Sequence, residues 1–258
     1  MKFKYISVIL LVAIFLNVGA FFTFAESDGI NWYIKRSGSK QPDLPKEHCV
    51  IQKYNGYYID KKLNDTSEIK RIYLTFDAGY ENGNVEKILD ILKEKDVPAA
   101  FFILNHIVKK NTDLVLRMTN EGHTVCNHTQ KHKNLSTSSR DEIINDITGL
   151  ELLYEKQTGM KMSKYFRFPE GKYSESALAV INDLGYKTIF WSFAYADWDD
   201  KNQPDTEKAK AKILENTHNG EVILLHPTSS TNAAILSELI DEWRAMGYSF
   251  GTMDELVR

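Results

Sequence analysis

Short apolar runs alternate with amphipathic segments along most of the chain, from residue 71 to residue 252. The runs have the length and composition of buried strands, and the segments between them have the apolar spacing of helices. Strands are expected at 71–76, 98–104, 123–126, 165–167, 187–192, 221–226 and 249–252, and helices at 84–95, 111–121, 139–157, 174–184, 204–217 and 231–247. This alternation predicts βα units and a parallel sheet.

Seven strands followed by helices suit an α/β fold of the distorted (β/α) barrel type with about seven parallel strands. A doubly wound open sheet is the alternative, because a list of strands does not show closure. The length of 258 residues fits one such domain, which we expect to span residues 71–258. Residues 26–70 contain prolines and polar clusters such as "SGSKQPDLPKEH" with little periodicity, so an irregular N-terminal arm is expected there.

The first 25 residues differ in composition from the rest. Two lysines precede an uncharged apolar run from Tyr5 to Phe24, and Thr23 and Ala25 offer a small-residue cleavage site. The run is also long enough to cross a bilayer, so residues 1–25 are predicted to be a signal peptide or a membrane anchor. In both cases the remaining chain is expected outside the cytoplasm.

Composition supports a substantial core and narrows the choice of partners. Hydrophobic residues make up 43% of the chain and charged residues 26%, as in a globular protein. Without residues 1–25, whose only charges are two lysines, the net charge falls from −3 to −5, which argues against nucleic acid as the main partner. An oxidising compartment permits a disulfide, but Cys126 ends the apolar stretch "HTVC" and is expected to be buried and not bridged to Cys49.

Candidate chemistry begins in "YLTFDAGYENG", where Asp77 follows an apolar strand. An acid in this position is often only a turn former or a helix cap. After the third strand, "NHTQKH" places His128 and His132 four residues apart. On a helical turn this spacing puts both imidazoles on one face, where they could bind one metal ion. A surface pair without a metal is the alternative. Because parallel strands end at one edge of the sheet, the two motifs are expected to meet.

Three further polar residues stand at strand ends. They are Arg167 in "RFPEG", Asp197 in "FAYADW" and His226 in "ILLHP". Each has a plainer structural interpretation, as a surface ion pair, a loop turn and a satisfied core histidine respectively. Their convergence with the other motifs at one edge favours an active site.

With these residues in view, the chain resembles the polysaccharide deacetylases, the NodB-homology group of carbohydrate esterase family four, from residue 71 to about residue 256. The five motifs "TFDAG", "HTQKH", "RFPEG", "DW" and "LLH" occur in the family's order. The longer strings "TFDAGYENG" and "WSFAYADW" are similar to the delta-lactam-biosynthetic de-N-acetylases of spore-forming bacteria, which act on muramic acid in spore cortex peptidoglycan. The resemblance implies a NodB-type barrel and a location at the cell wall or spore envelope.

The resemblance also implies catalytic roles for four residues. Hydrolysis of an N-acetyl amide needs a base to activate water and an acid to protonate the departing amine. Asp77 would be the base and His226 the acid. Arg167 would orient Asp77 and keep it ionised, and Asp197 would do the same for protonated His226.

The metal site departs from the family pattern. The usual motif, Thr-Phe-Asp-Asp-Gly, supplies a second carboxylate to the metal, whereas this chain has Ala78. His128 and His132 would then hold a divalent ion, whether zinc, manganese or magnesium, with water, substrate or Asp77. Such an ion is expected to bind weakly.

Five residues are candidates for substrate binding. Trp198 and Tyr80 are expected to stack on sugar rings at the rim, and a core position is the alternative for Trp198. The lactyl carboxylate of muramic acid calls for a local cation, for which Lys172 and Lys131 stand beside the motifs, with Lys131 better explained as a solvated surface residue. The resemblance further implies an oxyanion donor in the backbone N–H of Tyr173.

The expected function is metal-assisted deacetylation of peptidoglycan N-acetylmuramic acid during muramic delta-lactam formation in spore cortex. The substrate would be glycan strands whose stem peptides an amidase has already removed. A catalytically silent glycan-binding wall protein is the alternative that Ala78 favours, and a deacetylase of N-acetylglucosamine or chitin-type glycans is a third. The enzyme is preferred because a binding module needs neither base nor acid.

Overall fold

A curled parallel sheet forms the centre of the structure, a computed structural model that describes residues 29–258. Its strands follow the order β2-β8-β6-β5-β4-β3-β10-β9, and β11 pairs with the start of β3. All these pairs are parallel. The strands are β2 (Gly56–Tyr57), β3 (Lys70–Ala78), β4 (Ala100–Ile103), β5 (Thr124–Asn127), β6 (Tyr165–Phe166), β8 (Lys187–Ile189), β9 (Phe193–Ala194), β10 (Glu221–Leu225) and β11 (Tyr248–Phe250).

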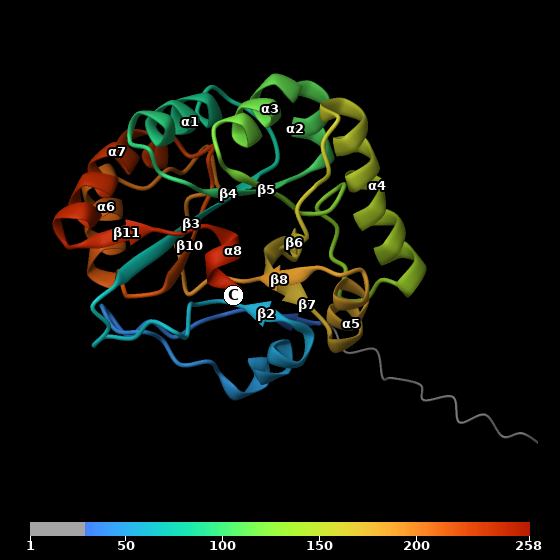
Figure 1. Ribbon diagram of the computed structural model, residues 1–258, viewed down its shortest axis with the longest axis horizontal. Coiled ribbons are helices and arrows are strands. Elements are labelled where there is room, and N and C mark those ends of the chain that lie inside the picture. Colours follow the sequence, from blue (N-terminus) through green and yellow to red (C-terminus); the bar gives the residue numbers. More distant parts are fainter. Residues whose placement is uncertain (1–28) are drawn as a thin grey trace, which may run out of the picture.

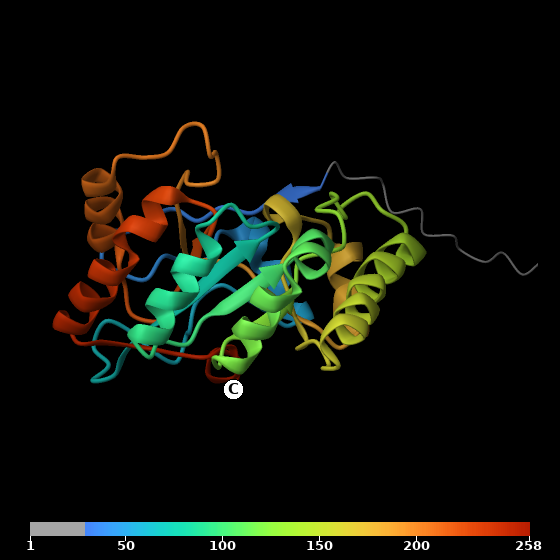
Figure 2. The ribbon, with the colours of Figure 1, turned by 90° about the horizontal axis from the view of Figure 1, so that it is seen from above.

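Most helices form an arc around the outer side of this sheet (Figure 1). Figure 2, a view from above, shows several of them packed side by side along the strands. The helices are α1 (Val85–Glu94), α2 (Asn105–Lys110), α3 (Thr112–Asn120), α4 (Arg140–Thr158), α5 (Glu175–Asp183), α6 (Thr206–Asn216), α7 (Ser230–Ala245) and α8 (Met253–Leu256). The expected distorted barrel is confirmed in the form of an open, curled half-barrel.

Local sequence signals explain where the helices begin and end. Helix α4 starts with a capping box, in which the side chains of Ser139 and Glu142 each bond the other residue's backbone N–H, and it ends at Gly159 with φ 72°. Helix α1 buries a stripe that starts at Val85 and includes Ile88, so its apolar face packs on the sheet. These periodic signals place each predicted helix within three residues of its observed bounds.

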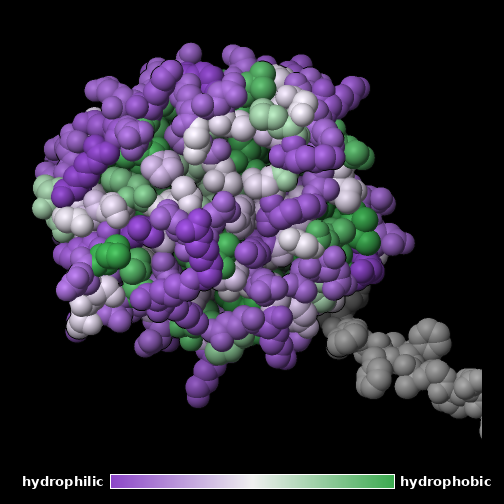
Figure 3. Space-filling model, in the orientation of Figure 1, coloured by the Kyte–Doolittle hydropathy of each residue, from purple (hydrophilic) through white to green (hydrophobic). Residues whose placement is uncertain are grey.

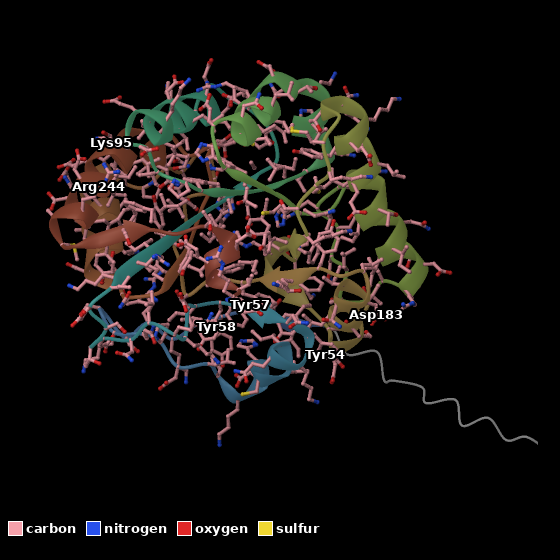
Figure 4. The ribbon with its side chains drawn as sticks, in the orientation of Figure 1. Tyr54, Tyr57, Tyr58, Lys95, Asp183 and Arg244 are labelled. Atoms are coloured by element: carbon pink, nitrogen blue, oxygen red, sulfur yellow. The ribbon has the colours of Figure 1, made fainter. Side chains whose placement is uncertain are left out.

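The N-terminal arm, for which an irregular course was predicted over residues 26–70, contains three short elements between irregular stretches. Its described part contains β1 (Ile30–Asn31), a 3-10 helix (Lys46–Tyr54) and β2, which extends the sheet next to β8. Trp32 and Tyr58 belong to a buried cluster with residues of α5 and β6. Figure 4 marks Tyr58 where the arm crosses below the sheet. The arm therefore shares the core of residues 71–258, because tertiary packing supplies the order that its local sequence does not predict.

The surface and the cysteines agree with a folded, unbridged domain. Hydrophilic residues cover most of the face drawn in Figure 3, and hydrophobic ones occur there in small separate groups. Cys126 is fully buried and not bridged to Cys49, as predicted, and Cys49 is exposed. Residues 29–258 include no helix with the length and apolarity needed to cross a membrane. The signal peptide or anchor predicted at residues 1–25 lies outside the described residues.

Candidate active site

Strand β3 places Asp77 inside the curl of the sheet. Side chains alternate along a strand, so Phe76 and Ala78 pack into the outer core beneath the helices, whereas Tyr73 packs in the inner cluster. Asp77 lies on the inner side at the carboxyl end of the strand, with 10% of its side chain exposed. Ala78 is fully buried on the opposite side.

Arg167, which follows β6, holds the Asp77 carboxylate. Its Nη1 donates to Asp77 Oδ1 (2.8 Å), its Nη2 donates to Thr75 Oγ1 (2.8 Å), and its Nε donates to the Ile189 carbonyl (3.0 Å). The guanidinium is fully buried and its carbon lies 4.1 Å from the centre of the Phe102 ring. The predicted pairing of Arg167 with Asp77 is therefore present, and the plainer interpretation of Arg167 as a surface residue is wrong.

This pairing keeps Asp77 ionised. Burial alone would raise the pKa of the Asp77 carboxyl, but the neighbouring imidazoles of His128 and His226 and the charge and hydrogen bond of Arg167 outweigh it and lower the pKa. Burial lowers the pKa of His128 itself to about 4, so that ring is neutral at physiological pH. The permanently charged Arg167 is then the partner that stabilises the Asp77 anion.

His128 and His132 lie together, but not on the helical turn that their spacing predicted. The segment after β5 is a loop in which Thr129 (φ 76°) and His132 (φ 56°) adopt left-handed backbone conformations. The Thr129 hydroxyl accepts a bond from the His132 N–H (2.9 Å), and the two imidazole rings lie 5.0 Å apart, centre to centre. The loop conformation therefore brings the two imidazoles together, as a helical turn was expected to do.

One nitrogen of His128 is free to bind a ligand. Its Nδ1 lies 2.9 Å from the Arg167 carbonyl, to which it donates as Nδ1–H, and its buried Nε2 has no hydrogen-bond partner, with Asp77 Oδ2 3.4 Å away. A backbone carbonyl that fixes the tautomer in this way is typical of metal-binding histidines.

His226 and Asp197 form the second pair. His226 follows β10, and its Nδ1 lies 2.7 Å from Asp197 Oδ1, while its backbone N–H donates to Asp197 Oδ2 (2.8 Å). Burial alone would lower the pKa of His226, but the hydrogen bond and charge of Asp197 and the charge of Asp77 outweigh it and raise the pKa. The ring therefore tends to keep its proton, and because Nδ1 is occupied, Nε2 is the nitrogen left for a ligand.

Asp77, the two histidines His128 and His132, and His226 all line one pocket of about 630 Å³ at the carboxyl ends of the strands. Of the predicted residues, it is lined by Asp77, His128, His132, His226, Trp198 and Tyr80. Glu170 and Trp191 also line it and were not predicted, although both lie inside the motifs "RFPEG" and "WSFAYADW". The structure singles out Glu170 by its backbone conformation. A φ of 56° is uncommon for a non-glycine residue, and such conformations often occur at functional sites.

Two exposed aromatic residues stand at the rim, as predicted. Trp198 is 61% exposed and its ring lies 6.3 Å from that of His226, centre to centre, so it is not a core residue. Tyr80 is 41% exposed, and its hydroxyl donates to Asp200 Oδ2 (2.6 Å) in the loop after β9. Both rings are available to stack on a sugar.

Tyr173 and Lys172 do not line the pocket, contrary to their predicted roles. They form β7 (Lys172–Tyr173), which pairs antiparallel with β1 in the register Ile30↔Tyr173. The Trp32 N–H donates to the Gly171 carbonyl (3.0 Å), so Ile30 and Tyr173 are the next hydrogen-bonded pair of this ladder. The ladder therefore uses the Tyr173 N–H, which cannot serve as an oxyanion donor in this arrangement.

The histidines fit a metal ion only in part. The orphaned Nε2 of His128 and the neighbouring ring of His132 are suitable nitrogen ligands. In the described part of the chain, however, no three His, Cys, Asp or Glu side chains gather closely enough to hold an ion. Ala78 offers no ligand and its side chain packs in the core. The residues present thus suit an ion held by two histidines and completed by ligands from outside the protein.

Comparison with known proteins gives consistent relatives. A family described as "Polysaccharide deacetylase" matches residues 64–189. The chain is 39% identical over 233 residues to "Peptidoglycan-N-acetylmuramic acid deacetylase PdaA" of Bacillus subtilis, covering 90% of this chain and 87% of that protein. It is 32% identical to "Peptidoglycan-N-acetylglucosamine deacetylase" of Bacillus cereus, over 73% of this chain and 89% of that protein.

Solved structures show the same likeness. The structure of Bacillus subtilis PdaA, described as a family 4 carbohydrate esterase, superimposes with a TM-score of 0.83 at 38% sequence identity. The match covers 89% of this chain and 97% of that one. A structural match of this extent must include residues well before residue 64, where the family match begins, so the described arm is part of the shared architecture.

Proposed function

The chain belongs to the polysaccharide deacetylase family, and on this premise we propose that it removes the N-acetyl group from N-acetylmuramic acid in peptidoglycan. One observation carries the proposal. A carboxylate bonded to Arg167 and an imidazole bonded to Asp197 open on the same pocket, and they can supply the base and the acid that amide hydrolysis needs. The similarity to PdaA supports muramic acid as the sugar.

The two pairs divide the reaction between them. Asp77 accepts a proton from a water molecule as that water adds to the acetyl carbonyl carbon. The C–N bond then breaks, and His226 gives its proton to the departing nitrogen, so that acetate and a free sugar amine are the products. The raised pKa of His226 and the lowered pKa of Asp77 support a protonated acid and an ionised base as the starting states of this reaction.

A divalent metal is expected from the family, and His128 and His132 are the residues that would hold it. When bound, such an ion supplies polarisation of the carbonyl and of the attacking water. The free Nε2 of His128 and its carbonyl-bound Nδ1 support this assignment. Zinc, manganese and magnesium are the candidate ions.

Lactam formation is the further step that we propose for the product. A freed amine on muramic acid lies on the same sugar as the lactyl carboxyl, and loss of water between them closes a six-membered ring. This closure needs a free lactyl carboxyl, so an amidase must first remove the stem peptide. The proposed setting is therefore the glycan of the bacterial wall or spore cortex, with the protein secreted or anchored through residues 5–24.

Mass spectrometry of muropeptides tests the proposal. The protein is incubated with peptidoglycan whose stem peptides have been removed, and the Asp77→Asn variant serves as the matched blank. Loss of acetyl from muramic acid, or of acetyl plus water, is the expected result. Loss of acetyl only from glucosamine residues would instead make this chain similar in activity to the glucosamine deacetylase of Bacillus cereus.

A silent glycan-binding protein is the second candidate, and Ala78 is the observation that favours it. Under this alternative the protein binds stem-free glycan strands but leaves every acetyl group in place, with or without added zinc, manganese or magnesium. Binding measured by sedimentation with the glycan, together with unchanged mass spectra, would support it over the enzyme.

A further inference from the structure

Asn232 contacts both members of the His226–Asp197 pair. It lies in the first turn of α7, is 1% exposed, and its Nδ2 donates to Asp197 Oδ2 (2.6 Å) and to the His226 carbonyl (3.0 Å). Its Oδ1 accepts a hydrogen bond from the Tyr195 hydroxyl. Every polar atom of this side chain is therefore used, and all its partners lie at the acid side of the pocket.

The orientation of the Asn232 amide is fixed by its partners. Two acceptors, the Asp197 carboxylate and the His226 carbonyl, face Nδ2, so the flipped amide would place an oxygen against two oxygens. The Tyr195 hydroxyl can donate to Oδ1, which completes the set. No alternative arrangement satisfies these buried groups.

Asp197 depends on this amide for its own orientation. The carboxylate is buried, and its Oδ1 accepts from His226 Nδ1 while its Oδ2 accepts from the His226 N–H and from Asn232. If the Asn232 donor is lost, Oδ2 keeps only the bond from the His226 backbone N–H, and a buried carboxylate with a missing partner is free to rotate. Rotation disturbs the bond that sets the tautomer of His226.

We propose that Asn232 is a positioning residue for His226, acting through Asp197, with Tyr195 as its support. The inference rests on the assignment of His226 as the acid under the proposed function. Asn232 does not line the pocket, so it affects the proton donor without touching the substrate.

The groups that face His226 come from several elements. Asp197 and Trp198 belong to the loop after β9, and Asp77 and Arg167 contribute charge from β3 and the end of β6. Elsewhere in the same pocket lie the side chains of His128, His132, Glu170 and Tyr80. Asn232 is the neutral group from α7, so replacing it by an apolar residue leaves the charges of the site unchanged.

The decisive experiment compares Asn232→Leu with Thr231→Val. Leucine has nearly the shape of asparagine and removes all three hydrogen bonds. Thr231 is an equally buried neighbour whose hydroxyl donates to the Pro204 carbonyl (2.6 Å), away from the pair, so its variant controls for a lost buried bond in the same turn. Both variants are assayed for kcat and KM on stem-free peptidoglycan, and the Nδ1–H proton of His226 is followed by NMR and assigned with His226→Gln.

Asn232→Leu is expected to lower kcat about ten-fold or more, with KM within about two-fold, because it disturbs a group that acts in the transition state. The downfield Nδ1–H signal should vanish or broaden, whereas Thr231→Val should keep both kcat and the signal. Tyr195→Phe should show a smaller loss than Asn232→Leu. If Asn232→Leu does not fold, Asn232→Ala, which removes the amide without adding a charge beside Asp197, takes its place.

Two results would overturn the proposal. One is an Nδ1–H signal or a kcat in Asn232→Leu that matches the wild type. The other is an equal loss in Thr231→Val, which would reduce Asn232 to a structural residue. If the wild-type protein shows no deacetylation, the proposed function fails, but the NMR comparison still decides whether Asn232 positions His226.

Discussion

Replacement of Asp77 by asparagine separates the chemical role of this residue from its structural one. Asparagine keeps the shape and an oxygen that can accept from Arg167, but removes the negative charge. Arg167 is fully buried, and its remaining partners, Thr75 and two backbone carbonyls, are neutral. Loss of one member of a buried ion pair costs about 3–5 kcal/mol, and the retained acceptor favours the lower end, roughly 3 kcal/mol.

The expected loss of stability determines the temperature at which activity must be measured. About 3 kcal/mol lowers the Tm of a protein of this length by roughly 6–12 °C. Deacetylation should fall by about 10²- to 10⁴-fold when measured well below the Tm of the variant, because the base is gone. The stability difference should shrink in acid, since the lowered pKa of Asp77 means that its contribution is present above the ordinary carboxyl pKa and is lost as the pH falls through the folded value.

Thr75→Val is the matched control for this prediction. It removes a hydrogen bond to the same guanidinium but leaves Asp77 in place, so stability should fall while most of the activity remains. Calorimetry and the acetate-release assay report the two quantities separately. An Asp77→Asn variant that keeps more than half of the activity would exclude Asp77 as the base, and an unchanged Tm would refute the ion-pair argument.

Three further predictions concern the metal site and the core. His128→Ala and His132→Ala should each lower bound metal and turnover, with partial rescue by added divalent metal in the single variants only; elemental analysis that finds full metal content in the double variant would exclude the pair as ligands. Ala78→Asp should bind zinc or manganese more tightly than the wild type in calorimetry, with equal or lower turnover. Without metal the variant should be less stable, because residue 78 packs in the core. Equal metal affinities of variant and wild type would mean that residue 78 does not reach the ion. Glu221 is fully buried with Oε1 unpaired, and burial raises its pKa well above the ordinary value, so folding keeps a proton that the unfolded chain releases as the pH rises above 4.5. Glu221→Gln should therefore be more stable than the wild type at about pH 8 and nearly equal at about pH 4 in denaturant unfolding, and an opposite order would show that the carboxyl is ionised in the fold.

Periodic segments were predictable because their signals are local. The stripe on α1 and the capping box at Ser139 each depend on a few neighbouring residues, and the barrel predicted from the periodic segments is confirmed. The arm was not predictable, since β2 is ordered by pairing with β8 and not by any pattern of its own.

The site was predictable to the extent that strand ends determine it. Asp77 lies at the carboxyl end of β3 and His226 directly follows β10, and these two strands pair in parallel, so their meeting at one edge follows from topology. The left-handed turn that joins the two histidine rings, the packing of Tyr173 against β1 and the place of Glu170 in the pocket depend on backbone conformations that residue spacing does not specify. The role of Asn232 could not be predicted from the sequence either, because its contact with Asp197 joins α7 to a loop 35 residues away in sequence.

The central claim is that this protein deacetylates muramic acid, and the position of the free amine tests it most directly. Stem-free peptidoglycan and a chitin-type oligosaccharide are incubated with the protein in parallel, and tandem mass spectrometry assigns the deacetylated sugar. The account predicts a free amine or a lactam on muramic acid, no change in the chitin-type glycan, and neither product with Asp77→Asn. A free amine found only on glucosamine, or unmodified glycans in every incubation, would contradict it.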